Sequence, residues 1–154
     1  MRKSPAHVTH SIRIDRPVQA VWEVVTDITN MPLWARGVEK ILHVDPPGEL
    51  ALGTKVTDIG LGLKKRWPET FWVDIFEPYE RIGFKWHGSY GTAYVRYQFA
   101  DCSGSTQFRG ETYGDYRFPF SLLLPLLRKT ANDNFRATLE NIRRICYGEK
   151  DFQK

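Results

Sequence analysis

The stretch that decides the fold is residues 81–116, RIGFKWHGSYGTAYVRYQFADCSGSTQFRGETYGDY. Within it, residues 82–87 and 93–99 alternate apolar side chains with charged or polar ones. Such alternation is typical of a half-buried β-strand, in which successive side chains point to opposite faces. Turn signals at 88–91 and 103–105 separate three strands. The stretch therefore predicts an antiparallel sheet with one apolar and one polar face.

The last hairpin of this stretch predicts its own register. A four-residue loop, 102–105, places Arg96 opposite Glu111, whereas a two-residue loop would place Arg96 opposite Arg109. Because like charges directly opposite each other are destabilising, we predict the four-residue loop. The final strand has Gly110 on its apolar face and little apolar bulk, so we expect the inner wall of the sheet to be thin there.

Upstream of this stretch, further strand-length runs separated by turn signals extend the sheet to about six antiparallel strands over 38–116. A strand-like segment, 7–14, and two short helices precede them. The first helix begins at Pro17 and has apolar residues at i, i+3, i+4 and i+7. The second ends before Gly37.

Downstream, the pattern predicts one long helix from about Pro119 to Tyr147. The residues at helical spacing are Phe120, Leu124, Leu127, Ala131, Phe135, Thr138, Ile142 and Ile145. We expect Pro125 to bend or start this helix. About 21 residues follow Pro125, or ~30 Å of helix, enough to cross a strongly curved sheet.

Length and composition favour one globular domain, 1–154, with a frayed tail at about 148–154. The net charge of +4 comes without the dense basic stripe of a nucleic-acid-binding protein. The run 64–66, Lys-Lys-Arg, is expected to be a solvated hairpin tip. Aromatic residues make up 14% of the chain, more ring surface than a core of this size needs, so rings are expected to line a concave site.

Several classes of protein are excluded by missing motifs. Cys102 and Cys146 form no CxxC pair, so we expect a reduced, cytoplasmic protein without a disulfide framework. The four histidines have no metal-binding spacing, and we expect neither a metal nor a cofactor. No nucleophile elbow or dinucleotide-binding loop is present. The first eight residues lack a secretory signal, and the longest apolar stretch, 118–127, is too short to span a bilayer.

The order of these elements, together with spaced residues within them, resembles the START-like polyketide cyclase superfamily (SRPBCC). The residues that carry the resemblance are Val21, Trp22, Asp27, Trp34 and Gly53, with the segments 77–82 and 123–127. No single motif is diagnostic, and the weight comes from order and spacing over nearly the whole chain.

The resemblance implies an α+β helix-grip fold: a curved seven-stranded antiparallel sheet, with two short helices after the first strand, wrapped around the C-terminal helix and enclosing a cavity. Members of the superfamily bind lipids, sterols, polyketides, quinones or plant hormones, and some are aromatase/cyclases. The superfamily has no universal catalytic residue, so the catalytic residues of this chain stay unknown. Fold alone supplies only an analogy for function.

The candidate ligand-binding residues are those on the predicted inner faces of the sheet and of the last helix, together with one tryptophan near the expected cavity mouth. They are Trp34, Trp86, Tyr97, Phe99, Phe108, Thr112, Leu124, Leu127, Ala131 and Phe135. For each Phe or Leu the alternative is ordinary core packing, and Trp34 could equally be a structural plug. Tyr97 and Thr112 place hydroxyls on an apolar wall, where each needs a partner. The phase of Asp74 is undetermined; we favour an outward, solvated position over an inward acid or base.

The leading hypothesis is binding of a hydrophobic small molecule, such as a lipid, quinone, sterol-like compound or polyketide, without catalysis. The alternative is a cyclase-, aromatase- or dehydratase-like enzyme in which Tyr97, Thr112 or Asp74 moves a proton. Two ionisable groups facing one point of the cavity would favour the enzyme, and a collapsed interior would favour a protein interaction module. No nucleic-acid partner is expected. Transient membrane contact through 118–127, followed by Arg128 and Lys129, and a homodimer stay open.

Overall fold

The structure is a computed structural model that describes residues 7–62 and 65–149. Its elements are β1 (Val8–Ile14), α1 (Val18–Thr26), the 3-10 helix η1 (Ile28–Asn30), α2 (Met31–Trp34), β2 (Val38–Asp45), β3 (Lys55–Gly62), β4 (Lys65–Glu77), β5 (Arg81–Gly88), β6 (Gly91–Cys102), β7 (Ser105–Tyr116) and α3 (Phe120–Cys146). The expected order of a strand, two short helical segments, six strands and one long helix is confirmed.

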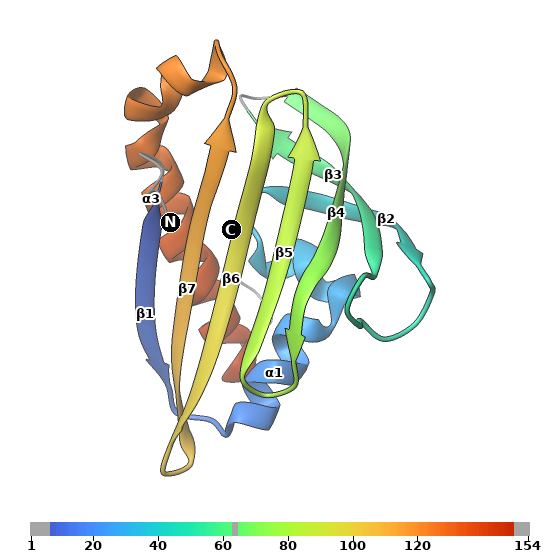
Figure 1. Ribbon diagram of the computed structural model, residues 1–154. Coiled ribbons are helices and arrows are strands. Elements are labelled where there is room, and N and C mark those ends of the chain that lie inside the picture. The colour runs from blue at the N-terminus through green and yellow to red at the C-terminus, as the bar shows by residue number, and fades with distance from the viewer. Residues whose placement is uncertain (1–6, 63–64, 150–154) are drawn as a thin grey trace.

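All seven strands form one antiparallel sheet in the order β1-β7-β6-β5-β4-β3-β2. Figure 1 shows α3 running behind the sheet, with β2 and β3 curling round on one side and α1 near one end. The long helix contacts β1, β7, α1 and α2. The predicted α+β helix-grip architecture, a curved sheet around the C-terminal helix, is confirmed.

The faces of the strands follow the alternation in the sequence. Ile82 and Phe84 on β5, and Tyr97 and Phe99 on β6, are buried on the inner face. The side chains between them lie on the outer face, where Lys85 and Arg96 each approach the ring of Tyr94. The apolar residues turn inward because only that face of the sheet is covered by helices.

The hairpin between β6 and β7 has the predicted register but a shorter loop. Arg96 lies directly opposite Glu111. The ladder continues to a pair between Cys102 and Ser105, so the loop contains 103–104 alone, and both of its residues have positive φ, 55° and 91°. This is the geometry of a type I′ turn, whose twist matches that of the flanking strands.

Helix α3 continues through Pro125, which lies inside the helix and does not start it. Its buried residues all belong to the second half: Phe135, Thr138, Leu139, Asn141 and Ile142. They pack where the inner wall is thin, because a Cβ on Gly110 would lie 2.9 Å from side-chain atoms of both Phe135 and Leu139. The glycine therefore lets the helix approach the sheet closely. Along the described ranges, no helix is long and apolar enough to cross a membrane.

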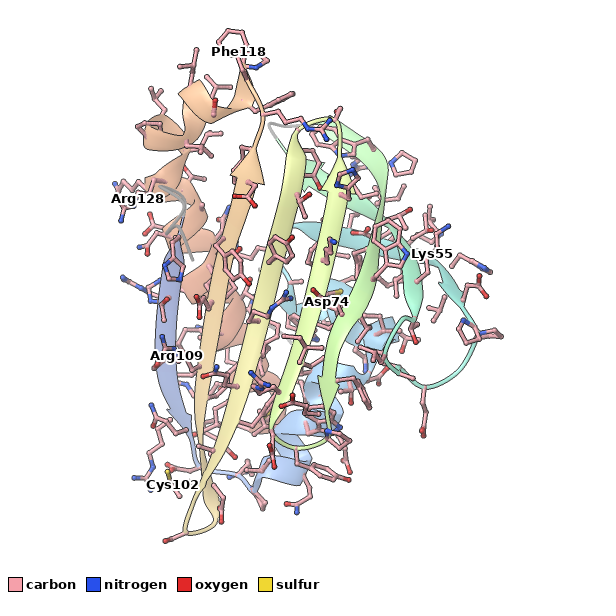
Figure 2. All side chains as sticks on the ribbon, in the orientation of Figure 1. Lys55, Asp74, Cys102, Arg109, Phe118 and Arg128 are labelled. Carbon is pink, nitrogen blue, oxygen red and sulfur yellow. The ribbon has the colours of Figure 1, made fainter. Side chains whose placement is uncertain are left out.

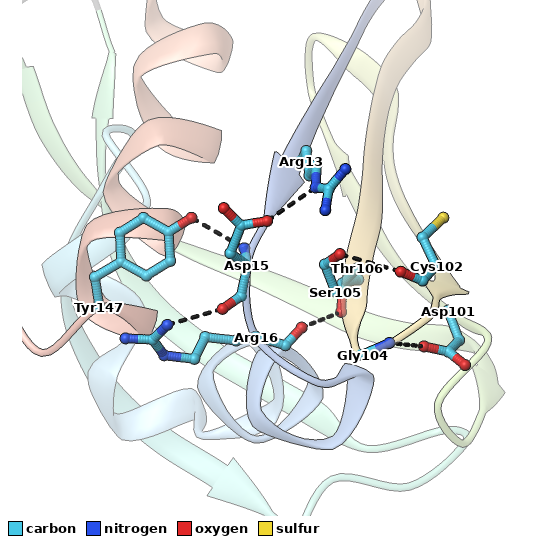
Figure 3. Close-up of polar contacts among 9 residues, drawn as sticks. All are labelled: Arg13, Asp15, Arg16, Asp101, Cys102, Gly104, Ser105, Thr106 and Tyr147. Atoms are coloured by element: carbon cyan, nitrogen blue, oxygen red, sulfur yellow. Dashed lines mark hydrogen bonds and ion pairs between the residues drawn. The ribbon is translucent and has the colours of Figure 1, made fainter.

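The C-terminal end of α3 is held to the first strand and the last hairpin (Figure 3). The Asp15 amide donates a hydrogen bond to the Tyr147 hydroxyl at 2.9 Å, and the Arg16 guanidinium lies 4.9 Å from the centre of the same ring. The Thr106 hydroxyl donates to the Arg16 carbonyl at 2.8 Å. These contacts connect three segments that are far apart in the sequence.

Asp74 lies on the outer face of the sheet, beside an irregularity in the pairing of β4 with β5. Both of its carboxylate oxygens accept hydrogen bonds from the Arg96 guanidinium, each at 2.7 Å. The outward position that we favoured is the one observed, although the carboxylate is paired with arginine and is not simply solvated. Asp74 is therefore no acid or base of the interior.

Two expectations concern segments that lie partly outside the described residues. In the Lys-Lys-Arg run, position 64 is not described, whereas Arg66 belongs to β4, is exposed and forms an ion pair with Glu39 at 2.8 Å. Of the tail expected at 148–154, only Gly148 and Glu149 are described.

Candidate functional site

A cavity of about 360 Å³ lies between the inner face of the sheet, the segment around α2 and the middle of α3. Aromatic rings form much of its wall, and these belong to Trp34, Trp86, Tyr90, Tyr97 and Phe135. A single helix laid across a strongly curved sheet cannot fill the whole concave side, so a space remains beside the helix.

Six of the candidate ligand-binding residues meet at this cavity: Trp34, Trp86, Tyr97, Thr112, Ala131 and Phe135. They come from α2, three adjacent strands and the middle of α3. Tyr97 and Phe135 stack with ring centroids 6.2 Å apart, and Trp34 meets Tyr97 edge-on at 6.1 Å. The wall is therefore assembled from segments more than 100 residues apart in the chain.

The other four candidate residues lie elsewhere. Phe99 and Phe108 pack against each other at 5.1 Å in the filled part of the interior, so the core-packing alternative holds for them. Leu124 and Leu127 do not line the cavity, because α3 first reaches it at Ala131, one turn further along the helix. Helical spacing put them in phase with Phe135, but it carries no information about where along the helix the sheet stops.

Sequence reasoning missed several residues of the wall. Met31 is the first residue of α2, Val38 is the first residue of β2, and Ala35 lies in the segment between them. Glu69 also lines the cavity. It shares one phase of β4 with Trp67, Phe71 and Val73, of which Phe71 and Val73 are fully buried, but the sequence left the phase of this strand undetermined. A charged residue in that apolar phase points inward.

Hydrogen-bonding groups without protein partners face this apolar space. Among the described residues, the Tyr97 and Thr112 hydroxyls, both from the cavity wall, take part in no hydrogen bond. The Trp34 Nε1–H also lacks an acceptor, but it is fully buried and does not open onto the cavity. Burial raises the pKa of the Tyr97 hydroxyl, so it stays neutral and can donate. Because an unmade hydrogen bond costs roughly 1–3 kcal/mol, the two hydroxyls favour a guest that carries polar atoms.

One acidic residue, Glu69, lines the cavity, and a second, Asp58, is buried next to it. Asp58 on β3 lies directly opposite Glu69 on β4. Burial, and then the nearby charge of Glu69, raise the pKa of Asp58 from 3.8 to about 7. Trp67 Nε1 donates a hydrogen bond to Glu69 at 2.7 Å. The cavity wall also contains a basic side chain, that of Arg36, which is exposed to solvent.

A metal centre is not indicated at this end. Among residues 7–62 and 65–149, no group of three or more His, Cys, Asp and Glu side chains comes together as a set of metal ligands. Both cysteines are free thiols. The polar side chains of the cavity wall are therefore those of Arg36, Glu69 and Asn134, together with tyrosine and threonine hydroxyls.

Comparison with known proteins shows to which family the chain belongs. Residues 5–146 match the family described as polyketide cyclase / dehydrase and lipid transport. The chain belongs to this family. No curated protein matches the sequence at a significant level. The fold of this member of the polyketide cyclase / dehydrase and lipid transport family can be compared with solved structures.

Solved structures share the fold at low sequence identity. A START superfamily protein from Mycobacterium smegmatis has a TM-score of 0.75 at 11% identity, covering 94% of this chain and 99% of that one. The Zhui aromatase/cyclase from Streptomyces sp. R1128 has a TM-score of 0.72 at 15% identity, with 92% and 93% covered. A polyketide-cyclase-like protein from Corynebacterium glutamicum has a TM-score of 0.64 at 21% identity, with 97% and 95% covered. At these identities the likeness establishes the fold alone.

Proposed function

We propose that the protein binds a hydrophobic small molecule in the cavity between the sheet and α3. The observation that carries the proposal is the ring-lined space of about 360 Å³ with the hydroxyls of Tyr97 and Thr112 on its wall. This volume lies near the lower end of the roughly 300–1,000 Å³ typical of small-molecule sites. A compact ring-containing molecule, such as a quinone or a polyketide, therefore fits better than a phospholipid with two acyl chains.

The relatives support the same class of ligand. The family description names polyketide chemistry and lipid transport, and one solved neighbour is an aromatase/cyclase. Burying ~300 Å² of apolar ligand surface would contribute roughly 7 kcal/mol before the costs of association, which is enough for micromolar binding.

A cyclase- or dehydratase-like enzyme is the second candidate, and one observation favours it. Glu69 and Arg36 both line the cavity, so its wall carries two ionisable groups in addition to rings and hydroxyls. The candidate acid Asp74 plays no part, because it pairs with Arg96 on the outer face. Binding remains our proposal since Arg36 is exposed to solvent, and an enzyme of this kind needs its acid and base in a dry pocket.

The first half of α3 offers a route by which such a ligand could arrive. Phe118 and Leu126 are 78% and 82% exposed, and Figure 2 shows Phe118 at the tip of the molecule with Arg128 along the helix. Between Asp115 and Asp133 the chain has no acidic residue, whereas Arg117, Arg128 and Lys129 are basic. Exposed apolar side chains flanked by basic ones suit an anionic membrane surface. We therefore propose that this end contacts a bilayer during ligand exchange.

The binding proposal is tested by filling the cavity. Ala131→Trp places a ring in the space, and Thr130→Trp adds the same ring at the neighbouring exposed position, outside the cavity wall. The protein is purified from its own host, the bound compound is identified by native mass spectrometry, and its affinity is measured for each variant. We expect at least tenfold weaker binding for Ala131→Trp and unchanged binding for Thr130→Trp.

Equal affinity for the two variants would contradict the cavity assignment. The same preparation separates binding from catalysis. The extracted compound is incubated with fresh protein, and its molecular mass is then measured again by mass spectrometry. We expect it to be recovered unchanged. A change in mass or absorption spectrum that requires Glu69 would establish the enzyme instead.

A further inference from the structure

The least satisfied polar group in the interior is the carboxylate of Asp58. Its side chain is 0% exposed, and neither Oδ1 nor Oδ2 has a hydrogen-bond partner. Within the described part of the chain, no basic side chain lies within 4.0 Å of it. Buried carboxylates are normally paired or hydrogen-bonded, so an ionised Asp58 places an uncompensated negative charge in the interior.

Asp58 faces the side of the sheet on which the cavity lies. Thr54 and Val56, which precede it at alternate positions, are buried on the inner face together with it. Its direct cross-strand neighbour Glu69 lines the cavity. In such a pair the Cβ atoms lie about 4.5–5.5 Å apart, so the two side chains are close neighbours on the inner face. Glu69 belongs to the cavity wall, whereas the oxygens of Asp58 are buried beside it and do not open onto the cavity.

The position of Glu69 is set by its surroundings. Trp67 Nε1 donates to Oε1 at 2.7 Å. The other oxygen, Oε2, lies above Gly60, where a Cβ would come within 2.6 Å of it. Glycine at position 60 thus leaves room for the carboxylate to lie against the sheet beside Asp58. The pair is held in place and is not a chance meeting of two flexible side chains.

Aromatic rings surround the space in front of this pair. Trp86 and Tyr90 line the same cavity as Glu69, and Trp86 packs at a tilt against Phe71 with ring centroids 4.6 Å apart. The faces of such rings attract cations, most strongly where water is excluded. Negative charge at one end and ring faces along the wall are complementary to an organic cation.

We propose that Glu69, with the buried carboxylate of Asp58 beside it, forms a subsite for the protonated amine of a ring-containing ligand whose apolar part occupies the cavity. This inference rests on the proposed function and narrows the ligand to hydrophobic amines. An ammonium group would donate to Glu69, and the negative charge of Asp58 would attract it from the adjacent strand without direct contact. An anionic ligand would meet the same two carboxylates with repulsion, and a neutral alcohol would gain no charge–charge attraction. Arg36, which is exposed on the wall, is the basic group that opposes this preference.

Three probes that share one ring system and differ in charge test the subsite. They are 1-naphthylmethylamine, 1-naphthalenemethanol and 1-naphthoic acid, each titrated calorimetrically into the full chain at neutral pH. A charge-assisted hydrogen bond corresponds to about a tenfold gain in affinity over a neutral one. We therefore expect the amine to bind about tenfold more tightly than the alcohol and the acid to bind most weakly.

Two variants assign the preference to the pair. Glu69→Gln and Asp58→Asn remove one negative charge each with little change in shape, and Glu111→Gln removes the same charge on the outer face of β7, where Glu111 pairs with His7. We expect the amine preference to disappear in the first two variants and to persist in the third. Circular dichroism on each variant confirms that it is folded.

The outcomes separate this inference from the proposed function. Binding of all three probes without a charge preference, or a preference that survives both Glu69→Gln and Asp58→Asn, overturns the amine subsite and leaves the hydrophobic cavity standing. Failure of every probe to bind counts against the cavity as a binding site, and the subsite falls with it.

Discussion

At one end of the space that the sheet encloses, the ring of Trp22 meets those of Phe76 and Phe99 at centroid distances of 5.5 and 5.3 Å, and the interior is filled. At the other end, the rings of Trp34 and Trp86 line a cavity of about 360 Å³. The same sheet and the same helix bound both ends. The difference shows that packing density within one small domain is set locally by which elements reach the interior.

Helix α3 makes the contrast visible along a single element. Its second half is buried through Leu139 and Ile142, whereas Leu122 and Leu126 in its first half are 66% and 82% exposed. The sheet covers only part of the helix, so equally apolar residues end in a core or in solvent. The filled end is therefore expected to carry stability, and the hollow end and the free half of the helix to carry binding.

The largest expected effect tests the filled end. Leu139→Ala removes a fully buried side chain next to Gly110, and we expect it to lower the free energy of unfolding by about 2–5 kcal/mol because a cavity remains. Leu126→Ala, at an exposed position of the same helix, is expected to change it by less than about 0.5 kcal/mol. Urea denaturation measures both. Similar losses in the two variants would erase the distinction between the halves of α3.

A second prediction concerns a substitution at the cavity end of the interior that we expect to stabilise the protein. The raised pKa of Asp58, about 7 against 3.8, means that the unfolded chain ionises first as the pH rises. The contribution of protonated Asp58 to stability is thus complete below pH 3.8 and is lost progressively up to about pH 7. Asp58→Asn cannot ionise. We expect the variant to be more stable than the wild type by on the order of 3 kcal/mol at about pH 8, with little difference at about pH 4.

Urea denaturation of both proteins at the two pH values is the measurement. Glu69 and Tyr90 are titratable neighbours, and burial, followed by the charges of Glu69, Tyr116 and Asp58, raises the pKa of the Tyr90 hydroxyl. A matched gain in the double variant Asp58→Asn/Glu69→Gln would assign the effect to Asp58. A variant that is less stable than the wild type at the higher pH would show that the carboxylate has a stabilising partner.

The smallest expected effect on stability belongs to the free half of α3. Phe118→Ser with Leu126→Ser removes two exposed apolar side chains, so we expect the free energy of unfolding to change by less than about 1 kcal/mol. Sedimentation with anionic vesicles should show about tenfold weaker binding than for the wild type, and neutral vesicles should bind neither protein. Unchanged vesicle binding would contradict the membrane contact. A change in oligomeric state in size-exclusion chromatography would instead assign this surface to a homodimer.

Much of the site could be predicted because burial follows phase. The alternation of β5 and β6 placed Trp86 and Tyr97 on the inner face, and helical spacing put Ala131 and Phe135 on the inner side of α3. For Leu127 the helical phase matched that of Phe135, but the residue lies on a part of α3 that the cavity does not reach. Periodicity predicts the face of an element on which a side chain lies, but not which other element packs against that face.

The residues that escaped prediction share a different cause. Glu69 was hidden because a charged residue in an apolar phase is easily taken for a break in the pattern, and Asp58 acquires its chemistry only from the strand that pairs with β3. Cross-strand partners depend on register, which turn lengths and bulges set. At the hairpin of β6 and β7 charge pairing was enough to predict the register; around Asp58 no such pair was readable.

The order of elements, the two faces of the sheet and the family resemblance were all encoded locally, since periods of 2 and 3.6 residues and turn residues act over a few positions of the chain. Three features arose only when segments distant in the chain packed together. They are the cavity, the position along α3 at which the sheet begins to cover it, and the cross-strand pairing of Asp58 with Glu69. Volume and proximity are properties of the assembled whole, because they depend on how far each element extends over the others.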